Sequence, residues 1–344
     1  MNPTIMSLML TNLAIGTIIT MTSTHWLMAW VGLELNTLAI IPIITKHHHP
    51  RSTEATTKYF LTQAAASAML LFASTMNAWH TGTWDISQLT NQPASIMLTL
   101  ALSMKLGLAP LHFWLPEVLQ GTSLTTALII TTWQKLAPMA LLFMTHNSLH
   151  PSTLILMGLL STLVGGWGGL NQTQMRKIMA FSSVAHLGWM ATIMTLNPNL
   201  ALLNLMLYLV MTTSTFIMLM QTSSKTIKDL TTASALSPST LAIMMILMMS
   251  LGGLPPLTGF MPKWLILQEL TNHNFMITAL MMALSALLSL FFYLRLTYVS
   301  TLTAFPSTTN TMHKWRFKPN INTTMMSLML LTSIMLLPIT PMLL

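Results

Sequence analysis

A series of apolar segments, each about as long as a lipid bilayer is thick, constrains this chain more than any other feature. A helix needs about 20 predominantly apolar residues to cross the hydrocarbon core. Eleven such segments can be drawn between clusters of Pro, Asn, Thr and His. They cover residues 3–22, 25–45, 58–79, 95–116, 123–145, 151–171, 175–196, 199–221, 238–270, 274–299 and 323–343. The sequence therefore predicts an all-α integral membrane protein, with about eleven transmembrane helices in one domain over 1–344.

The composition supports this class and excludes several kinds of site. Charged residues make up only 6% of the chain, against about 25% in soluble domains, so most of the exterior must face lipid. The chain has no cysteine, which excludes disulfides, thiolate metal sites and iron–sulfur ligation. The N-terminus has neither a basic region nor a cleavage site, so we expect the first segment to remain as a permanent helix.

Lysine and arginine are distributed unequally between the two sides of the predicted membrane domain. Of the fourteen, eleven lie with the N-terminus on the side of the loops that follow even-numbered segments. They are Lys46, Arg51, Lys58, Arg176, Lys177, Lys225, Lys228, Arg295, Lys314, Arg316 and Lys318. Because cations accumulate on the cytoplasmic side or its equivalent, we expect the N-terminus there and the C-terminus opposite.

The three remaining cations, Lys105, Lys135 and Lys263, fall within predicted spans, and so does Glu34. A charged side chain at the centre of an inserting helix costs roughly 2.5–3.5 kcal/mol, so such residues usually have a task. A buried lysine can load and release a proton, which an arginine cannot. The alternative interpretation is that each charge snorkels to the interface or forms a structural ion pair.

Two proline-rich segments, 107–117 and 253–263, align without a gap and end in Pro followed by a charge. Proline removes a backbone donor, so we expect both helices to be discontinuous. The predicted spans run in opposite directions through the membrane, which indicates inverted five-helix repeats at roughly 1–146 and 151–300, followed by a C-terminal helix at 323–343. The alternative is a chance match of a common loop sequence.

The deep histidines, His112 and His186, could relay protons or could be core residues bonded to nearby hydroxyls. His112 follows Lys105 by seven residues, nearly the same face if the helix continued. The run at 47–49 lies beside Lys46 and Pro50, and we interpret it as interfacial rather than as a metal site. No nucleotide-binding fingerprint follows a strand, and no histidine spacing favours haem, so we expect no metal and no cofactor in this chain.

Five segments together carry a resemblance to a known family: WVGLELN at 30–36, KLGLAPLHFWLPE at 105–117, WQKLAP at 133–138, SSVAHLG at 182–188 and GGLPPLTGF at 252–260. They resemble the subunit 2 family of mitochondrial NADH:ubiquinone oxidoreductase (respiratory complex I), one of its antiporter-like subunits. The resemblance covers the whole chain. Relatives of these subunits usually have fourteen helices, and the resemblance implies that the first three have no counterpart in this sequence.

The resemblance implies a multi-pass protein of the mitochondrial inner membrane, with the N-terminus in the matrix and the C-terminus in the intermembrane space. It implies a part in proton translocation coupled to electron transfer from NADH to ubiquinone. It implies other membrane-arm subunits and inner-membrane lipids, cardiolipin among them, as partners, and no nucleic acid. NADH, FMN, iron–sulfur clusters and ubiquinone would then bind to other subunits, with no redox centre in this chain.

Residue by residue, the resemblance pairs Glu34 with Lys105, makes Lys135 a central bridging lysine and makes Lys263 the charge of the second broken helix. Our hypothesis is a hydrated proton axis through these four residues, assisted by His112 and His186, in which Glu34 stabilises the ammonium of Lys105. Two other classes stay open, namely an autonomous cation/proton antiporter and a structural spacer of the membrane arm.

Overall fold

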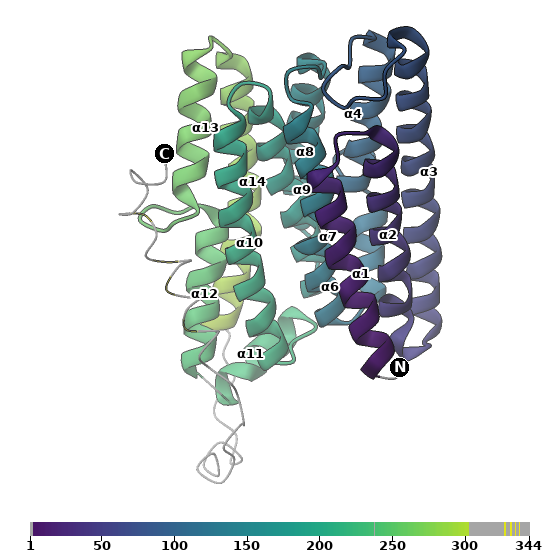
Figure 1. Ribbon diagram of the computed structural model, residues 1–344. Coiled ribbons are helices and arrows are strands. Elements are labelled where there is room, and N and C mark those ends of the chain that lie inside the picture. Colours follow the sequence, from purple (N-terminus) through teal and green to yellow (C-terminus); the bar gives the residue numbers. More distant parts are fainter. Residues whose placement is uncertain are drawn as a thin grey trace. The chain divides into compact units, whose positions relative to one another are not determined.

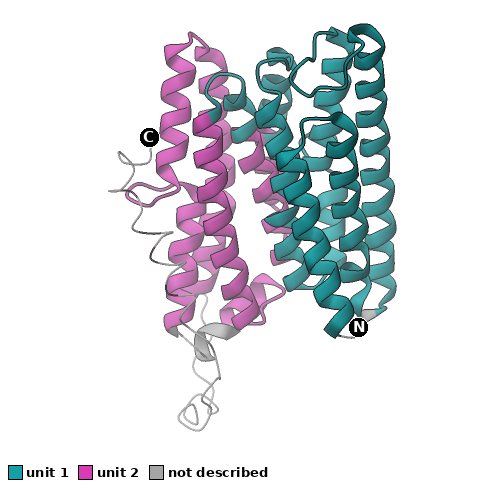
Figure 2. Cartoon of the chain, in the orientation of Figure 1, with its two compact units in different colours: residues 1–161, 190–198 teal, residues 162–189, 199–344 magenta. Residues whose placement is uncertain are grey.

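Helices form the regular structure in the part of the chain that the computed structural model describes, apart from two isolated β-bridges. This part comprises residues 3–236 and 238–302, with isolated positions 327, 331, 334 and 337 (Figure 1). The predicted last span, 323–343, lies outside the continuous ranges. The chain divides into two compact units, residues 1–161 with 190–198 and residues 162–189 with 199–344 (Figure 2).

The first unit begins with three long helices and continues with shorter ones. They are α1 (Pro3–Thr22), α2 (Trp26–Ile44), the 3-10 turn η1 (Thr45–His47), α3 (Pro50–Thr81), α4 (Gln92–Leu106), α5 (Trp114–Gly121), α6 (Leu124–Thr131) and α7 (Trp133–Met144). Two helices, α8 (Pro151–Gly169) and α9 (Met175–Met194), contribute residues to both units. The second unit also contains α10 (Pro198–Gln221), α11 (Ile227–Leu236), α12 (Pro238–Gly252), α13 (Phe260–Asn272) and α14 (Met276–Leu302).

Seven helices among the described residues are long and apolar enough to cross a membrane. They cover Pro3–Thr22, Trp26–Ile44, Pro50–Thr81, Leu124–Met144, Pro151–Gly169, Pro198–Gln221 and Met276–Thr301. The all-helical membrane class is therefore confirmed. The count of about eleven spans, the single domain and the inverted arrangement stay predictions.

Two predicted boundaries were wrong. Helix α3 begins at Pro50 rather than at 58, because the His49 ring accepts a hydrogen bond from the Arg51 N–H and proline suits the first helical turn. The segment 227–236, expected to be a loop, forms α11. Its start is capped by Asp229, whose carboxylate accepts hydrogen bonds from the backbone N–H groups of Lys225 and Thr226.

The predicted span 123–145 is confirmed as Leu124–Met144, and a bend at Thr132 inside it separates α6 from α7. The Thr132 hydroxyl donates to the Leu128 carbonyl at 2.7 Å, a back-bond that tends to bend helices. Pro138, inside α7, also leaves the Gln134 carbonyl without its usual helical donor. These local features place Lys135 directly after the bend.

Close packing of α1 against α2 fixes the helix that carries Glu34. A Cβ atom added at Gly32 would lie 2.6 Å from the Thr20 Cγ2 atom and 2.9 Å from the Gly16 carbonyl oxygen. Small residues let helix backbones approach in this way inside membranes. Asn36, one helical turn after Gly32, lies on this same side of α2, since a Cβ atom added at Gly16 would lie 2.5 Å from its Oδ1 atom. Together with Leu33 and Thr37 it also lines a cavity in the interior of the unit.

Candidate functional site

The first broken helix ends with Lys105 in its last turn. Helix α4 stops at Leu106, and Gly107 follows in the left-handed conformation with φ +81°. The N–H groups of Gly107 and Leu108 both donate to the Ser103 carbonyl, at 2.8 and 2.9 Å, which closes the helix end. The Leu106 carbonyl belongs to the final turn, whose carbonyls lack helical donors.

Lys135 reaches this helix end from α7. Its Nζ atom donates a hydrogen bond to the Leu106 carbonyl and lies 5.9 Å from the centroid of the Trp114 ring. The side chain is only 1% exposed. The C-terminal end of a helix carries partial negative charge and an aromatic face attracts cations. The two contacts therefore offset part of the cost of burying a cation in an otherwise apolar interior.

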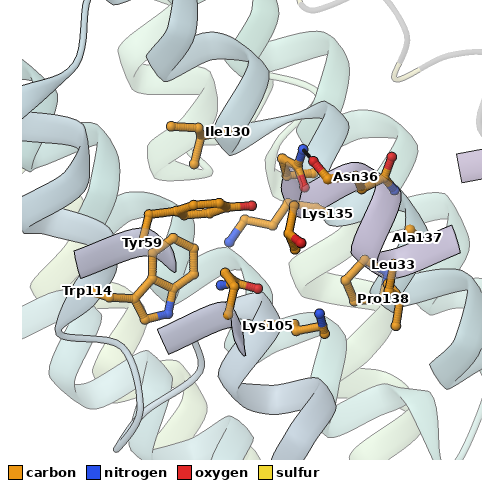
Figure 3. A pocket seen from close by; sticks show the side chains of 12 residues that line it. Leu33, Asn36, Tyr59, Lys105, Trp114, Ile130, Lys135, Ala137 and Pro138 are labelled. Atoms are coloured by element: carbon orange, nitrogen blue, oxygen red, sulfur yellow. Dashed lines mark hydrogen bonds between the residues drawn. The ribbon is translucent and has the colours of Figure 1, made fainter. Parts of the chain in front are cut away.

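A small cavity of about 10 Å3 joins Lys105 and Lys135 (Figure 3). This volume is about the room that one water molecule needs. In Figure 3 the Lys135 side chain reaches along the cavity towards Trp114. Sequence analysis missed three polar residues of the wall, Asn36, Gln63 and Gln134. A polar side chain within an apolar span was the signal that could have identified them.

Lys105 is 4% exposed, and its Nζ atom has no hydrogen-bond partner among the described residues. Glu34 accepts a hydrogen bond from the Thr37 hydroxyl at 3.0 Å. Ion pairs link Lys58 to Glu54, Lys58 to Glu117 and His273 to Glu269, and none of these three pairs involves Glu34 or Lys105. The pairing of Glu34 with Lys105 stays a prediction.

The second broken helix, in the other unit, has the same local backbone at its end. Helix α12 stops at Gly252, and Gly253 follows with φ +79°. The N–H groups of Gly253 and Leu254 both donate to the Met249 carbonyl, at 3.1 and 3.3 Å. Lys263, in the first turn of α13, donates from its Nζ atom to the Gly252 carbonyl at 2.8 Å.

Lys263 faces a much larger space than Lys135 does. A groove of about 550 Å3 lies beside it, lined by residues of α12, α13 and α14 together with Trp189. Trp264 and Leu287 in its wall are more than half exposed. The groove is therefore open at the surface of the unit, and its lining is mainly apolar.

The two candidate relay histidines have different surroundings. His186 lies close to Lys263 across a gap with no room for water, forms a hydrogen bond with the backbone of Leu251, and has its ring centroid 5.5 Å from that of Tyr208. His112 is buried in the segment between α4 and α5, beside Phe113. His112 would share a face with Lys105 only in a continuous helix, and the backbone unwinds at Gly107 between them, as the proline-rich segment predicted.

Glu117, the charge that ends the first proline-rich segment, has a partner that sequence analysis did not find. The Lys58 ammonium on α3 lies 2.6 Å from the Glu117 carboxylate on α5 and 2.5 Å from Glu54. All three side chains are exposed, and exposed pairs contribute little to stability because water screens them. No cluster of three or more His, Cys, Asp or Glu side chains in the described ranges could hold a metal ion.

Known proteins resemble this chain over nearly its whole length. The family model of the transmembrane part of NADH:quinone oxidoreductase/Mrp antiporter proteins matches residues 23–291, and the model of the NADH dehydrogenase subunit 2 C-terminus matches residues 290–344. "NADH-ubiquinone oxidoreductase chain 2" of Varanus timorensis is 59% identical over 341 residues, 99% of each chain. The Xenopus laevis protein of the same name is 57% identical, with the same coverage.

Solved structures give the same relationship. A chain of respiratory complex I from Thermus thermophilus superposes with a TM-score of 0.83 and 26% identity, covering 97% of this chain and 79% of that one. A chain of the Mrp complex from Dietzia is 16% identical and superposes with a TM-score of 0.74, covering 85% of this chain and 59% of that one. At that identity the likeness concerns the fold alone.

Proposed function

The chain belongs to the transmembrane NADH:quinone oxidoreductase/Mrp antiporter family, and from this premise we propose that Lys105, Lys135 and Lys263 carry protons through it. It is a core membrane-arm subunit of respiratory complex I and contributes to proton translocation coupled to electron transfer from NADH to ubiquinone. It is a multi-pass protein of the mitochondrial inner membrane that assembles with other subunits of the complex.

The proposal for the lysines is carried by one observation. Two ammonium groups are bonded to the final carbonyls of interrupted helices, Lys135 at Leu106 and Lys263 at Gly252. Interrupted backbone at membrane depth is tolerated where protein or a wet cavity covers it. A lysine amine bonded to a helix end can lose its proton and regain it while the fold stays the same. An arginine side chain stays charged, so it could not do this.

In the first unit, we propose that Lys105 and Lys135 exchange a proton across the cavity of about 10 Å3 that both line. Glu34, held by Thr37 on α2, would attract the charge towards Lys105 in one state and release it in another. In the second unit, His186 lies close to Lys263 and would assist transfer there. His112 would act as a relay within the unwound segment.

The finer assignments belong to the same proposal. We place the N-terminus in the matrix and the C-terminus in the intermembrane space, because most cations share the N-terminal side. The aligned proline-rich segments support inverted repeats at roughly 1–146 and 151–300. We assign NADH, FMN, iron–sulfur clusters and ubiquinone to other subunits, and a boundary layer of inner-membrane lipid, including cardiolipin, to this one.

The test compares Lys105→Met and Lys135→Met with Lys58→Met, a surface lysine, in intact complex I. Each complex is reconstituted in vesicles, and the proton-to-electron ratio is measured during NADH oxidation. We expect all three variants to assemble, and only the two buried-lysine variants to lower the ratio. An unchanged ratio in both of them would refute the proposal and favour a structural spacer.

A further inference from the structure

The two broken helices end in the same way, residue for residue. The gapless alignment that pairs Gly107 with Gly253 also pairs Leu106 with Gly252. In each unit this residue is the last of its helix, and the next one is a glycine with a positive φ angle, +81° or +79°. Leu106 and Gly252 therefore expose equivalent carbonyls at equivalent helix ends.

An ammonium meets each of these carbonyls, but the two lysines come from different places. Lys135 reaches Leu106 from α7, 29 residues further along the chain. Lys263 reaches Gly252 from α13, 11 residues further along and directly after the break. Sequence alignment alone would not pair these lysines, because the position aligned with Lys263 in the first segment is Glu117, which is bonded to Lys58 instead.

Resting on the proposed function, we propose that Lys135 and Lys263 are functional counterparts. Each would hold its proton as an ammonium docked on the terminal carbonyl of the broken helix in its own unit. A helix C-terminus stabilises a cation through the partial charge of its free carbonyls. In both units the end of the broken helix therefore supplies the cation site. The lysine that binds there can come from different helices, α7 in one unit and α13 in the other.

The same alignment leaves Lys105 without a counterpart. The position aligned with it in the second segment is Leu251, whose backbone is hydrogen bonded to His186. Lys105 itself has no hydrogen-bond partner among the described residues. Lys105 would thus be the charge that is specific to the first unit, while Lys135 and Lys263 perform the step common to both.

The difference in access between the two sites allows a direct test by chemical rescue. Lys263→Ala would leave the Gly252 carbonyl beside the open groove of about 550 Å3, where a small alkylammonium ion can enter. Lys135→Ala would leave the Leu106 carbonyl in the buried interior of the other unit, where Lys135 itself is only 1% exposed and a small alkylammonium ion has no open route from the surface. Propylammonium offers N–H donors, whereas tetramethylammonium has the charge but no donor.

We expect the proton-to-electron ratio of intact complex I to fall in both variants. Propylammonium should restore it in Lys263→Ala, with saturation, and tetramethylammonium should not. Lys135→Ala should not respond to either ion. As a control, the proton-to-electron ratio of wild-type vesicles is measured with the same amine, because an amine can itself change the proton gradient.

Three results would overturn the inference. If Lys263→Ala lowers the ratio and propylammonium does not restore it, the proposal that the ammonium must be bonded to the Gly252 carbonyl is refuted. The proposed role of Lys263 in proton translocation is then kept. If Lys263→Ala leaves the ratio unchanged, the proposed role of that lysine fails as well. Independently of any variant, a map of wild-type complex I in which either ammonium points away from its carbonyl would exclude the docked state.

Discussion

Substitution of Gly253 by alanine separates the structural role of the second break from its role in holding Lys263. Gly253 has φ +79°, and an L-residue in the left-handed region costs about 1–2 kcal/mol. The added Cβ atom would lie 3.0 Å from both the Cδ and the Nζ atoms of Lys263. The end of a lysine side chain can move away at little cost, but its 2.8 Å bond to the Gly252 carbonyl would then be lost.

Gly82 supplies a matched control in the same chain. It ends α3 with φ +72°, and a Cβ atom there would meet nothing within 4 Å. Gly82→Ala should therefore carry the backbone cost alone. We expect both variants to lose about 1–2 kcal/mol of stability, which is about a 5–30-fold change in the folded-to-unfolded ratio.

The two assays are thermal unfolding of purified complex I and the proton-to-electron ratio in vesicles. Gly253→Ala and Gly82→Ala should shift the unfolding temperature by similar amounts, and only Gly253→Ala should lower the ratio. Equal ratios in the two variants would refute the argument that the position of the Lys263 ammonium matters. A much larger loss of stability in Gly253→Ala would show that the lysine cannot give way as the geometry indicates.

Three further outcomes follow from contacts outside the lysine sites. Glu117→Gln should lower the unfolding temperature only slightly, with a difference from wild type that disappears at high salt, because Lys58 and Glu117 are exposed; a salt-independent loss would contradict this. Hydrogen bonds from the backbone N–H groups of Thr226 and Lys225 hold the pKa of Asp229 below its usual value. Hydrogen-exchange protection at the start of α11 should therefore persist as pH falls to about 3.9, where a free aspartate titrates, and be lost only below that. Asp229→Asn should abolish this pH dependence, and identical profiles would exclude the cap. Gly32→Ala should push α1 away from α2, because the added Cβ atom would lie 2.9 Å from the Gly16 carbonyl oxygen. We expect the free energy of unfolding to fall by about 1–3 kcal/mol, and an unchanged unfolding temperature would refute the close packing.

Much of the membrane architecture was predictable because it depends on local chemistry. Apolar length predicts spanning helices, and proline predicts where a helix must stop. The breaks after Leu106 and Gly252 lie where the proline-rich segments predicted them. The start of α3 and the existence of α11 were missed, since each depends on a cap, by His49 and by Asp229, that hydropathy does not register.

The candidate site was predictable only as a set of residues. A charged residue within an apolar span can be recognised from the sequence alone, because burial of a charge in the membrane is costly and therefore rare. The geometry did not follow from the same argument. Asn36, noted in the sequence only as the end of the segment WVGLELN, lines the cavity beside Lys105 and Lys135.

The sequence by itself determined that this chain is a helical membrane protein, with three lysines and a glutamate within apolar segments and with two interrupted helices. These are consequences of composition and of proline, which act within a few residues. Only the tertiary structure decided that Lys135 and Lys263 meet equivalent carbonyls. That equivalence depends on how α7 packs against the end of α4 and how α13 turns back towards α12, and contacts between separate helices leave no periodic trace in the sequence.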